Sequence, residues 1–539
     1  TPLYSSAASD VYKRQLMGGV SMSVTTQSVS TDSAPKKRNL TIIESAYVAV
    51  MLFGMFFGAG NLIFPVFLGA NAGTNFVPAT IGFIVTGVGL PLLGVTALAM
   101  SRANGLFELS SKPSRKYGMF FTCVLYLTIG PFFAIPRCAT TSYTVGLERV
   151  IPQDGNGQLY LFLFSVVFFA LAFFFAMKPS GILTWVGKVL TPIFLVFLGI
   201  LVFTALFSPV SGASADAAPI GKYVNESFFT GFLDGYNTMD ALASLAFGII
   251  VVSTIRSFGV KDPKDVAVNT VRSGFFSCLL MALIYVAIVV VGVRSRALFK
   301  PAENGGVTLA QVARYHLGNV GLLVLAATVT LACLKTAVGL IVSCSETFSK
   351  LFPKGPSYRV WSVLITLVSF GLANFGLSTI IEYAVPVLMF LYPLSIVLIL
   401  LALCGRLFGN SKVVYAWTLG FTGVAAVYDF LNSLPQALRS ALHMNDMLVV
   451  VQNWLPFSEF GMAWVCPAVV GFVVGYVRMV LFENKDMEEV ARLAAGPDLE
   501  GSVASDDYYS SSDAEFNEPA DFAVSAKSTV DEPNFSEQS

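Results

Sequence analysis

The chain has 539 residues, of which 55% are hydrophobic and 12% are charged, and its mean hydropathy is +0.71. Soluble globular chains carry about 25% charged residues, so this composition excludes that class, and the balance of 33 basic against 33 acidic residues excludes a basic nucleic-acid-binding protein. Seven scattered cysteines and two distant histidines lack the spacing of disulfide scaffolds or metal sites, so we predict a polytopic helical membrane protein.

The two ends of the chain differ from its body. Residues 1–15 begin without Met and follow no pattern, so we interpret them as translated linker sequence within a disordered segment at 1–40. Residues 485–539 are rich in Ser, Asp and Glu and are predicted to form a disordered acidic tail. A single membrane domain is expected between them, at 41–484.

The body of the chain is a series of long apolar runs. A bilayer core of about 30 Å requires roughly 20 apolar residues per helix. Such runs occur at 43–66, 78–101, 118–146, 158–177, 185–208, 228–256, 272–294, 318–349, 360–377, 380–404, 412–434 and 460–482. They are continuous and do not alternate with period two, which favours helices over β-strands. The sequence therefore predicts an all-α protein with twelve transmembrane helices.

Charges in the loops predict the orientation of these helices. Basic residues begin at 36–38 and recur in every second loop, at 102–116, 178–188, 256–272, 350–359 and 406–412. The opposite loops hold few bases except at 294–317, and long loops follow the positive-inside rule poorly. Both termini are therefore predicted to be cytoplasmic.

The first apolar run contains residues that interrupt α-helical geometry. Gly54 is followed by Gly58-Ala59-Gly60-Asn61, and Phe64-Pro65 closes the run. Glycines let the backbone leave helical geometry, and the amides freed at a half-helix N-terminus suit a carboxylate. The alternative is a glycine-rich face for helix packing, which is common in membrane helices.

The sixth run repeats this pattern, with Gly235-Tyr236-Asn237-Thr238-Met239-Asp240 followed by Ser244-Leu245-Ala246-Phe247-Gly248. Interruptions in the first and sixth helices predict two five-helix halves in inverted orientation, with two further peripheral helices. Asp240 lies inside an apolar run, where a carboxylate is costly, and is a functional candidate. The alternative is a structural carboxylate that caps freed backbone amides.

At these residues the chain resembles the branched-chain amino acid:cation symporter family, the BrnQ-type carriers of bacteria. The resemblance covers Ile43 to Phe482 and is carried by FFGAGNLIFP at 56–65, GPFFAIPR at 130–137, GYNTMDALASLAFG at 235–248 and CLKTAVGL at 333–340. It implies a LeuT-like fold and import of leucine, isoleucine and valine across the bacterial cytoplasmic membrane with Na⁺ or H⁺. It implies no enzymatic activity, no cofactor and no obligate protein partner.

The resemblance also implies a substrate site. Gly58 to Asn61 would be the unwound stretch of the first helix, and Ser244 to Gly248 that of the sixth. Backbone amides would hold the carboxylate, polar groups from Asn237 to Ser244 would hold the ammonium, and aromatic rings would enclose the side chain. The residues implied are Ala59, Gly60, Asn61, Tyr126, Asn237, Ser244 and Phe247. For Phe247 the alternative is ordinary packing, because the chain has 46 Phe.

A cation site is implied beside it, from the carbonyls of Gly54 and Phe57 and from three positions on one face of the eighth helix, Ala332, Lys335 and Thr336. Lys335 departs from the hard oxygen ligands that Na⁺ requires. Either its amine occupies the cation site and exchanges a proton, which favours H⁺ coupling, or it extends towards the cytoplasm or pairs with Asp240 while Na⁺ uses backbone oxygens and Thr336.

Two other charges lie in apolar runs. Arg137 and Glu382 are interpreted either as a gating or coupling pair or as interfacial charges near helix ends. The sequence has no HExxH, GxSxG or P-loop motif and no repeated charged rings, which disfavours an enzyme, an ATPase or a channel. A carrier for another neutral amino acid and a non-transporting receptor remain as alternatives.

Overall fold

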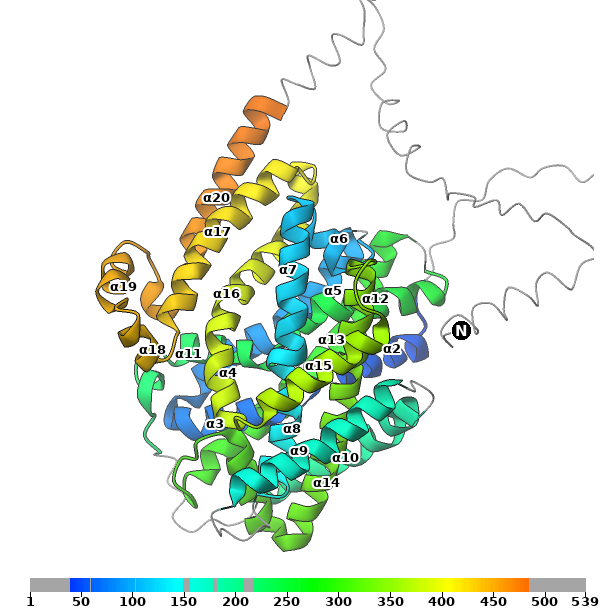
Figure 1. Cartoon of the computed structure of the whole chain (residues 1–539), viewed down its shortest axis with the longest axis vertical. Helices are drawn as coiled ribbons and strands as arrows, with labels where there is room; N and C mark the ends of the chain where they lie inside the picture. The colour runs from blue at the N-terminus through cyan, green and yellow to red at the C-terminus, as the bar shows by residue number, and fades with distance from the viewer. Residues whose placement is uncertain are drawn as a thin grey trace, which may run out of the picture. The chain divides into compact units, whose positions relative to one another are not determined.

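A computed structural model of the chain describes residues 39–58, 60–101, 103–148, 156–177, 182–207, 217–260 and 262–483, with the backbone alone at 182–194 and 483. Every regular element among these residues is a helix (Figure 1). Nine helices of the described part are long and apolar enough to cross a membrane, and three further apolar helices, Ile42–Phe56, Leu195–Phe207 and Tyr358–Ala373, are shorter. The chain is therefore an all-helical, multi-pass membrane protein.

The elements follow the apolar runs of the sequence in chain order. The first part contains α2 (Ile42–Phe56), α3 (Gly60–Ala72), η1 (Gly73–Asn75), α4 (Phe76–Ile84), η2 (Val85–Gly89), α5 (Leu90–Ser101), α6 (Leu106–Ser110), α7 (Arg115–Leu127), η3 (Thr128–Phe132), α8 (Ala134–Val145), α9 (Gly157–Met177) and α10 (Ile182–Phe207). The next part contains η4 (Gly221–Tyr223), α11 (Ser227–Asp234), η5 (Gly235–Thr238), α12 (Asp240–Ser257), α13 (Pro263–Ser295), α14 (Gly305–Leu351), α15 (Tyr358–Ala373) and α16 (Leu377–Cys404). The last described part contains η6 (Gly405–Phe408), α17 (Lys412–Asn432), α18 (Gln436–Ala441), α19 (Asn445–Gln452), η7 (Ser458–Phe460), α20 (Val465–Arg478) and η8 (Met479–Glu483).

The first helix is interrupted where its glycines lie. A capping box starts α2, because Thr41 and Glu44 exchange side-chain and backbone hydrogen bonds. The helix ends at Phe56, Phe57 is extended with φ −74° and ψ 102°, and α3 begins at Gly60. The two halves differ in burial: 11 of the 13 residues of α3 are buried, whereas the buried residues of α2 lie along one face.

The sixth helix is interrupted as well, at the first of the two stretches that the sequence marks, while the prediction that the second stretch is unwound is wrong. After α11 the chain makes a short 3₁₀ turn, η5, and Met239 adopts a left-handed conformation with φ 62° before α12 begins. Residues 244–248, predicted to be unwound, are continuous helix within α12. Gly248 serves close packing instead, since a Cβ there would lie 2.9 Å from Leu98 Cδ1 of α5.

The third helix bends at GPFFAIPR. Between α7 and α8, the π-helical turn η3 contains Gly130 with non-helical φ −98° and ψ −120°, followed by Pro131. Proline removes a backbone donor and a glycine tolerates the departure from helical geometry. The bend sets the direction of α8, which carries Arg137.

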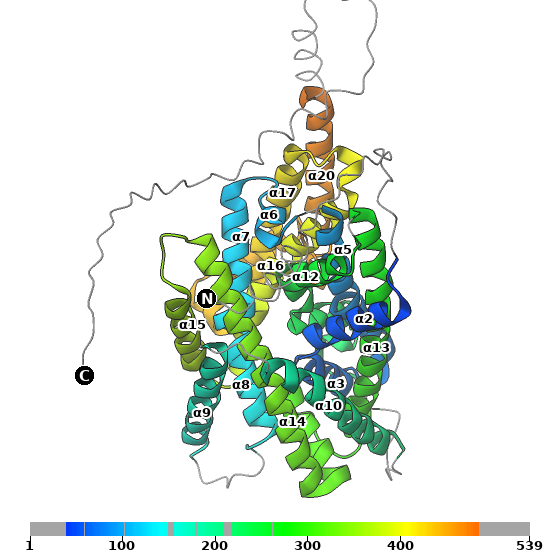
Figure 2. The ribbon, with the colours of Figure 1, turned by 90° about the vertical axis from the view of Figure 1, so that its right-hand side faces the viewer.

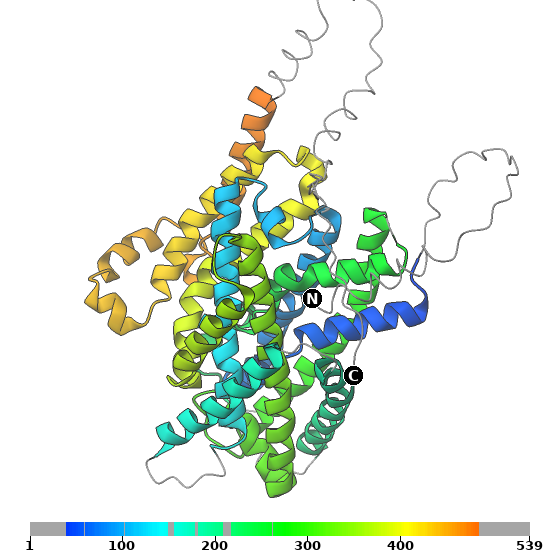
Figure 3. The ribbon, with the colours of Figure 1, turned by 45° about the vertical axis from the view of Figure 1, so that its right-hand side comes forward.

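The helix contacts made by the first apolar run are repeated by those of the sixth, five runs later in the chain. The halves of the first helix, α2 and α3, pack on α13, and the halves of the sixth, α11 and α12, pack on α4 and α5. Helix α8 packs on α14 and α16, while α14 also packs on α10 (Figure 2). Helix α9 packs on α15. The pair α17 and α20 packs side by side, joined through α18 and α19 (Figure 3).

Candidate functional site

The interruptions of the first and sixth helices are joined by a buried hydrogen-bond network centred on Asn61. Its side-chain oxygen accepts from the Gly58 backbone N–H at 3.0 Å, and its amide nitrogen donates to Asp240 Oδ2 at 2.6 Å. Tyr285 of α13 donates to the same carboxylate oxygen at 3.3 Å and is also hydrogen-bonded to Asn61. One side chain thus fixes the two broken helices relative to each other.

The position of Asp240 explains how the fold tolerates a buried carboxylate. Asp240 is the first residue of α12 and is only 3% exposed. Helix N-termini carry partial positive charge and unpaired N–H groups, so they favour an acidic side chain. Asn61 and Tyr285 supply side-chain donors. The carboxylate therefore lies where helix dipoles and donors converge.

A buried guanidinium lies on the other side of the same interruption. Arg137 on α8 is 6% exposed and donates from Nη1 to the Asn237 carbonyl oxygen at 2.6 Å. The guanidinium also lies over the Phe64 ring, 5.2 Å from its centroid. A Cβ on Gly60 would be 3.1 Å from Arg137 Nη2, so the glycine leaves room for this side chain. Arg137 is thus a central residue of the site and not an interfacial charge.

The predicted cation site is partly assembled. Helix α14 packs against α3, and Lys335 Nζ lies 3.5 Å from the Gly54 carbonyl oxygen. The Thr336 hydroxyl bonds its own helix at the Ala332 carbonyl (3.1 Å). A Cβ on Gly58 would lie 3.8 Å from this hydroxyl, so Thr336 also borders the first interruption. Within the described chain, Lys335 contacts a backbone carbonyl, whereas Asp240 is bound by Asn61 and Tyr285.

The remaining predicted site residues lie in different places. Tyr126 on α7 donates to the Ala246 carbonyl at 3.1 Å, which brings the third helix to Phe247, itself half-buried. Ser244 is fully buried against Gly94 of α5, and its hydroxyl donates to the Ala241 carbonyl at 2.6 Å. The Phe57 ring stacks on Phe53 with centroids 4.8 Å apart. Ala59 lies outside the described residues.

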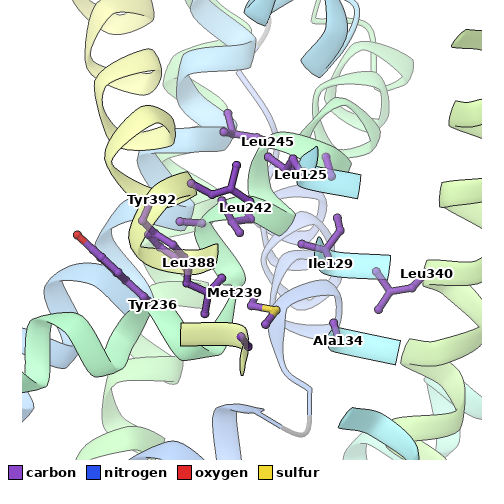
Figure 4. Packing of buried hydrophobic residues seen from close by; sticks show 14 of the residues in the cluster. Leu125, Ile129, Ala134, Tyr236, Met239, Leu242, Leu245, Leu340, Leu388 and Tyr392 are labelled. Carbon is purple, nitrogen blue, oxygen red and sulfur yellow. The ribbon is translucent and has the colours of Figure 1, made fainter. Parts of the chain in front are cut away.

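Two tyrosines of this region carry no signal in the sequence. Tyr285 completes the Asn61–Asp240 network, and Tyr392 of α16 stacks on Tyr236 of η5 with ring centroids 4.0 Å apart. Figure 4 shows Tyr236 and Tyr392 within the same packed cluster as Met239 and Leu242. Their roles depend on neighbours that are distant in the chain, which a single sequence does not reveal.

Comparison with known proteins identifies the family. The family described as "Branched-chain amino acid transport protein" matches residues 42–481. The chain belongs to this family.

Its relatives in this family are full-length matches. The branched-chain amino acid permease BrnQ of Lactobacillus delbrueckii subsp. lactis is 45% identical over 449 residues, which is 83% of this chain and 100% of that protein. The branched-chain amino acid permease BraB of Bacillus subtilis strain 168 is 38% identical over 456 residues, 84% and 100% of the two chains.

The fold of this family member has a counterpart among solved structures. Mhp1 in its inward-facing conformation aligns with a TM-score of 0.51 at 12% identity, over 85% of this chain and 96% of that one. Mhp1 is a transporter of LeuT fold, so the likeness identifies a LeuT-like fold and, at this identity, nothing more. The expected fold is confirmed at this level.

Proposed function

We propose that this protein imports leucine, isoleucine and valine across the bacterial cytoplasmic membrane by cation symport. The observation that carries the proposal is a pair of buried opposite charges beside the interruptions: Arg137 of α8, bonded to the Asn237 carbonyl, and Asp240 of α12, bonded to Asn61. A free α-amino acid is a zwitterion, and a buried cation and a buried anion beside two facing helix breaks match its two ends. The names of the permeases similar to this chain agree with this substrate class.

The proposed binding mode assigns each end of the substrate. The carboxylate binds at the N-terminus of α3, through the amides of Ala59 and Gly60 and the Arg137 guanidinium. The ammonium binds near Asp240 and the Asn237 carbonyl. The contact of Arg137 with Asn237 and the space that Gly60 leaves for it support this arrangement. The ends of the zwitterion would then be recognised by groups from three helices.

The aliphatic side chain is proposed to lie beside Tyr126 and Phe247. The hydrogen bond from Tyr126 to Ala246 holds the third helix against this part of α12. An apolar pocket distinguishes ligands that differ by one methylene by only about 1–3 kcal/mol. Leucine, isoleucine and valine should therefore share the site.

The proposed coupling ion is H⁺. An ammonium near the Gly54 carbonyl occupies the position that the resemblance gives to Na⁺, and the Thr336 hydroxyl is bonded to its own helix. Lysine can exchange a proton when it is removed from water, whereas Na⁺ needs several hard oxygen ligands. Under this proposal the Lys335 amine replaces the metal ion.

The proposed architecture has twelve transmembrane helices: two inverted five-helix halves and a peripheral pair, with both termini in the cytoplasm. The repetition of contacts supports the two halves: α2 and α3 pack on α13 as α12 and α11 pack on α5 and α4. The alternation of basic loops supports the orientation.

Leucine uptake into proteoliposomes, with Na⁺ and pH gradients imposed separately, tests the function. An inward proton gradient, with the acidic side outside, should drive leucine uptake. Excess valine or isoleucine should inhibit it. Accumulation driven by Na⁺ alone would refute the ion assignment. Saturable leucine binding without accumulation would indicate a receptor, and insensitivity to valine and isoleucine would indicate another neutral amino acid.

A further inference from the structure

A second buried carboxylate lies outside the site described above. Asp429 on α17 is 2% exposed, and no described side chain donates a hydrogen bond to its carboxylate oxygens; the donor beside it is the Ala463 backbone N–H. A buried ionised carboxylate with so few donors and no counter-charge is strongly unfavourable in a membrane protein. Asp429 therefore requires a ligand or a proton that neutralises its charge.

The surroundings of Asp429 connect it to the interruption of the sixth helix. The segment before α20 packs on α11: Phe460 stacks on Phe229 with centroids 4.4 Å apart, and a Cβ on Gly461 would lie 2.8 Å from Leu233 Cδ1. This packing brings the indole of Trp464 beside the Tyr236 hydroxyl. The Ala463 backbone N–H lies beside Asp429, which also interacts electrostatically with Tyr236.

The side chains that interact with Asp429 carry tyrosine hydroxyls. In the described part of the chain, the Tyr428 hydroxyl is buried without a hydrogen-bond partner, and the Tyr236 hydroxyl lies beside the indole N–H of Trp464. An indole N–H can only donate, and a tyrosine hydroxyl readily does so. Such a set suits an ionised carboxylate and offers a metal cation too few oxygen ligands.

Among the described residues, no base is found among the titratable groups that interact with Asp429. Tyr236 of η5 and Tyr428 of its own helix are the titratable side chains that interact with it. On the packed helices, Tyr392 of α16 stacks on Tyr236, Cys466 of α20 follows Trp464 by two positions, and Asp446 of α19 is exposed. Arg439 of α18 donates to Asn432 instead, at 3.4 Å.

We infer that Asp429 is a proton-binding site that controls the packing of α17 and α20 against the interruption of the sixth helix. One proton passes between water and a carboxylate oxygen, and no other reactant is needed. The neutral acid can stay buried with few donors, whereas the carboxylate attracts the Tyr236 and Tyr428 hydroxyls. Burial ends close to the site, because α17 is partly exposed from Phe430 onward.

Tryptophan fluorescence measures this event directly. The chain has 5 Trp, so replacing Trp185, Trp361, Trp417 and Trp454 by Phe leaves Trp464 as the reporter beside Tyr236. The purified variant should show a single-proton fluorescence titration at constant Na⁺. Asp429→Asn should abolish the titration, Asp429→Glu should retain it, and Asp446→Asn, which alters an exposed carboxylate on α19, should leave it unchanged.

Three results would overturn the inference: a flat titration in the parent, a titration that persists in Asp429→Asn, or a signal that follows Na⁺ at constant pH. Size-exclusion elution and the Asp429→Glu variant distinguish loss of the proton site from loss of the fold. The titration needs no substrate, so failure of leucine uptake would leave it interpretable. If the sixth-helix interruption binds leucine, saturating leucine should also shift the titration midpoint, because linked binding equilibria are reciprocal.

Discussion

Replacing Asn61 by alanine should uncouple the two interrupted helices. The variant removes the 3.0 Å bond from Gly58, the 2.6 Å bond to Asp240 and the bond with Tyr285. A hydrogen bond to a charged group contributes about 1.5–3 kcal/mol and a neutral one about 0.5–1.5 kcal/mol, so roughly 2.5–6 kcal/mol of interaction between the two helices is lost. Since about 1.4 kcal/mol is tenfold in affinity, leucine affinity should fall at least tenfold.

The assay is a double-mutant cycle on leucine binding to purified protein, with Asn61→Ala, Asp240→Asn and the double variant. The control is Asn71→Ala on the same helix, whose side chain, within the described part of the chain, bonds the Phe67 carbonyl of its own helix at 2.8 Å. Asn61 and Asp240 should show a coupling energy of about 1.5–3 kcal/mol, the range for a charged hydrogen bond. Additive effects within about 0.5 kcal/mol would refute the reasoning, because independent sites behave in that way.

Further outcomes follow from the same contacts. Lys335→Thr should make leucine uptake depend on Na⁺. The control Lys350→Thr, which alters an exposed lysine on the same helix, should not. Leucine uptake by Lys335→Thr that does not respond to Na⁺ would contradict the assignment of the Lys335 ammonium to the cation site. Gly69→Ala should lower the free energy of unfolding by about 1–3 kcal/mol, because its Cβ would approach the Val289 backbone carbon to 2.8 Å. A Cβ on Gly339 would have no neighbouring atom within 4 Å, so Gly339→Ala should stabilise its helix by up to about 1 kcal/mol. Equal melting temperatures for the two glycine variants would contradict the close packing of Gly69 on Val289. Excess valine and isoleucine should each inhibit labelled leucine uptake, since one methylene is worth about 1–3 kcal/mol; selectivity beyond that range would require a polar contact to the side chain.

The helices and the first interruption could be predicted from the sequence because both depend on local composition. Long apolar runs form helices in a bilayer whatever their neighbours are. The Gly58-Ala59-Gly60 stretch permits the change of direction that the structure has after Phe57. Local chemistry thus determines which segments cross the membrane and where the first of them opens.

The sequence marks two stretches of the sixth run, Gly235–Asp240 and Ser244–Gly248, but does not decide which of them is unwound, because glycine has two uses in membrane helices. Gly235 lies against Thr86 within the 3₁₀ turn, while Gly248 lies against Leu98 in a continuous helix. A single sequence does not distinguish these two glycines. The residue that packs against each glycine from a neighbouring helix decides whether the helix is interrupted there.

Arg137 illustrates a second limit. Its position after Pro136 is compatible with a helix end, and the carboxylate partner that the sequence suggests, Glu382, is exposed in the structure. In the structure its main partner is a backbone carbonyl 100 positions along the chain, in the sixth-helix interruption. Interactions with backbone oxygens leave no residue-type signature, so a buried charge of this kind is recognised only when the fold is known.

The unequal burial of the two halves of the first helix has a consequence for gating. Helix α3 is enclosed on nearly every side, while α2 presents Ile42, Tyr47 and Val50 outward, at 81%, 56% and 68% exposure. Rotation of α2 about Phe57 and Gly58 would break packing contacts along one face of that helix only. Displacement of α3 would break contacts on nearly all of its faces. Of the two halves, α2 is therefore the one whose displacement would cost less packing.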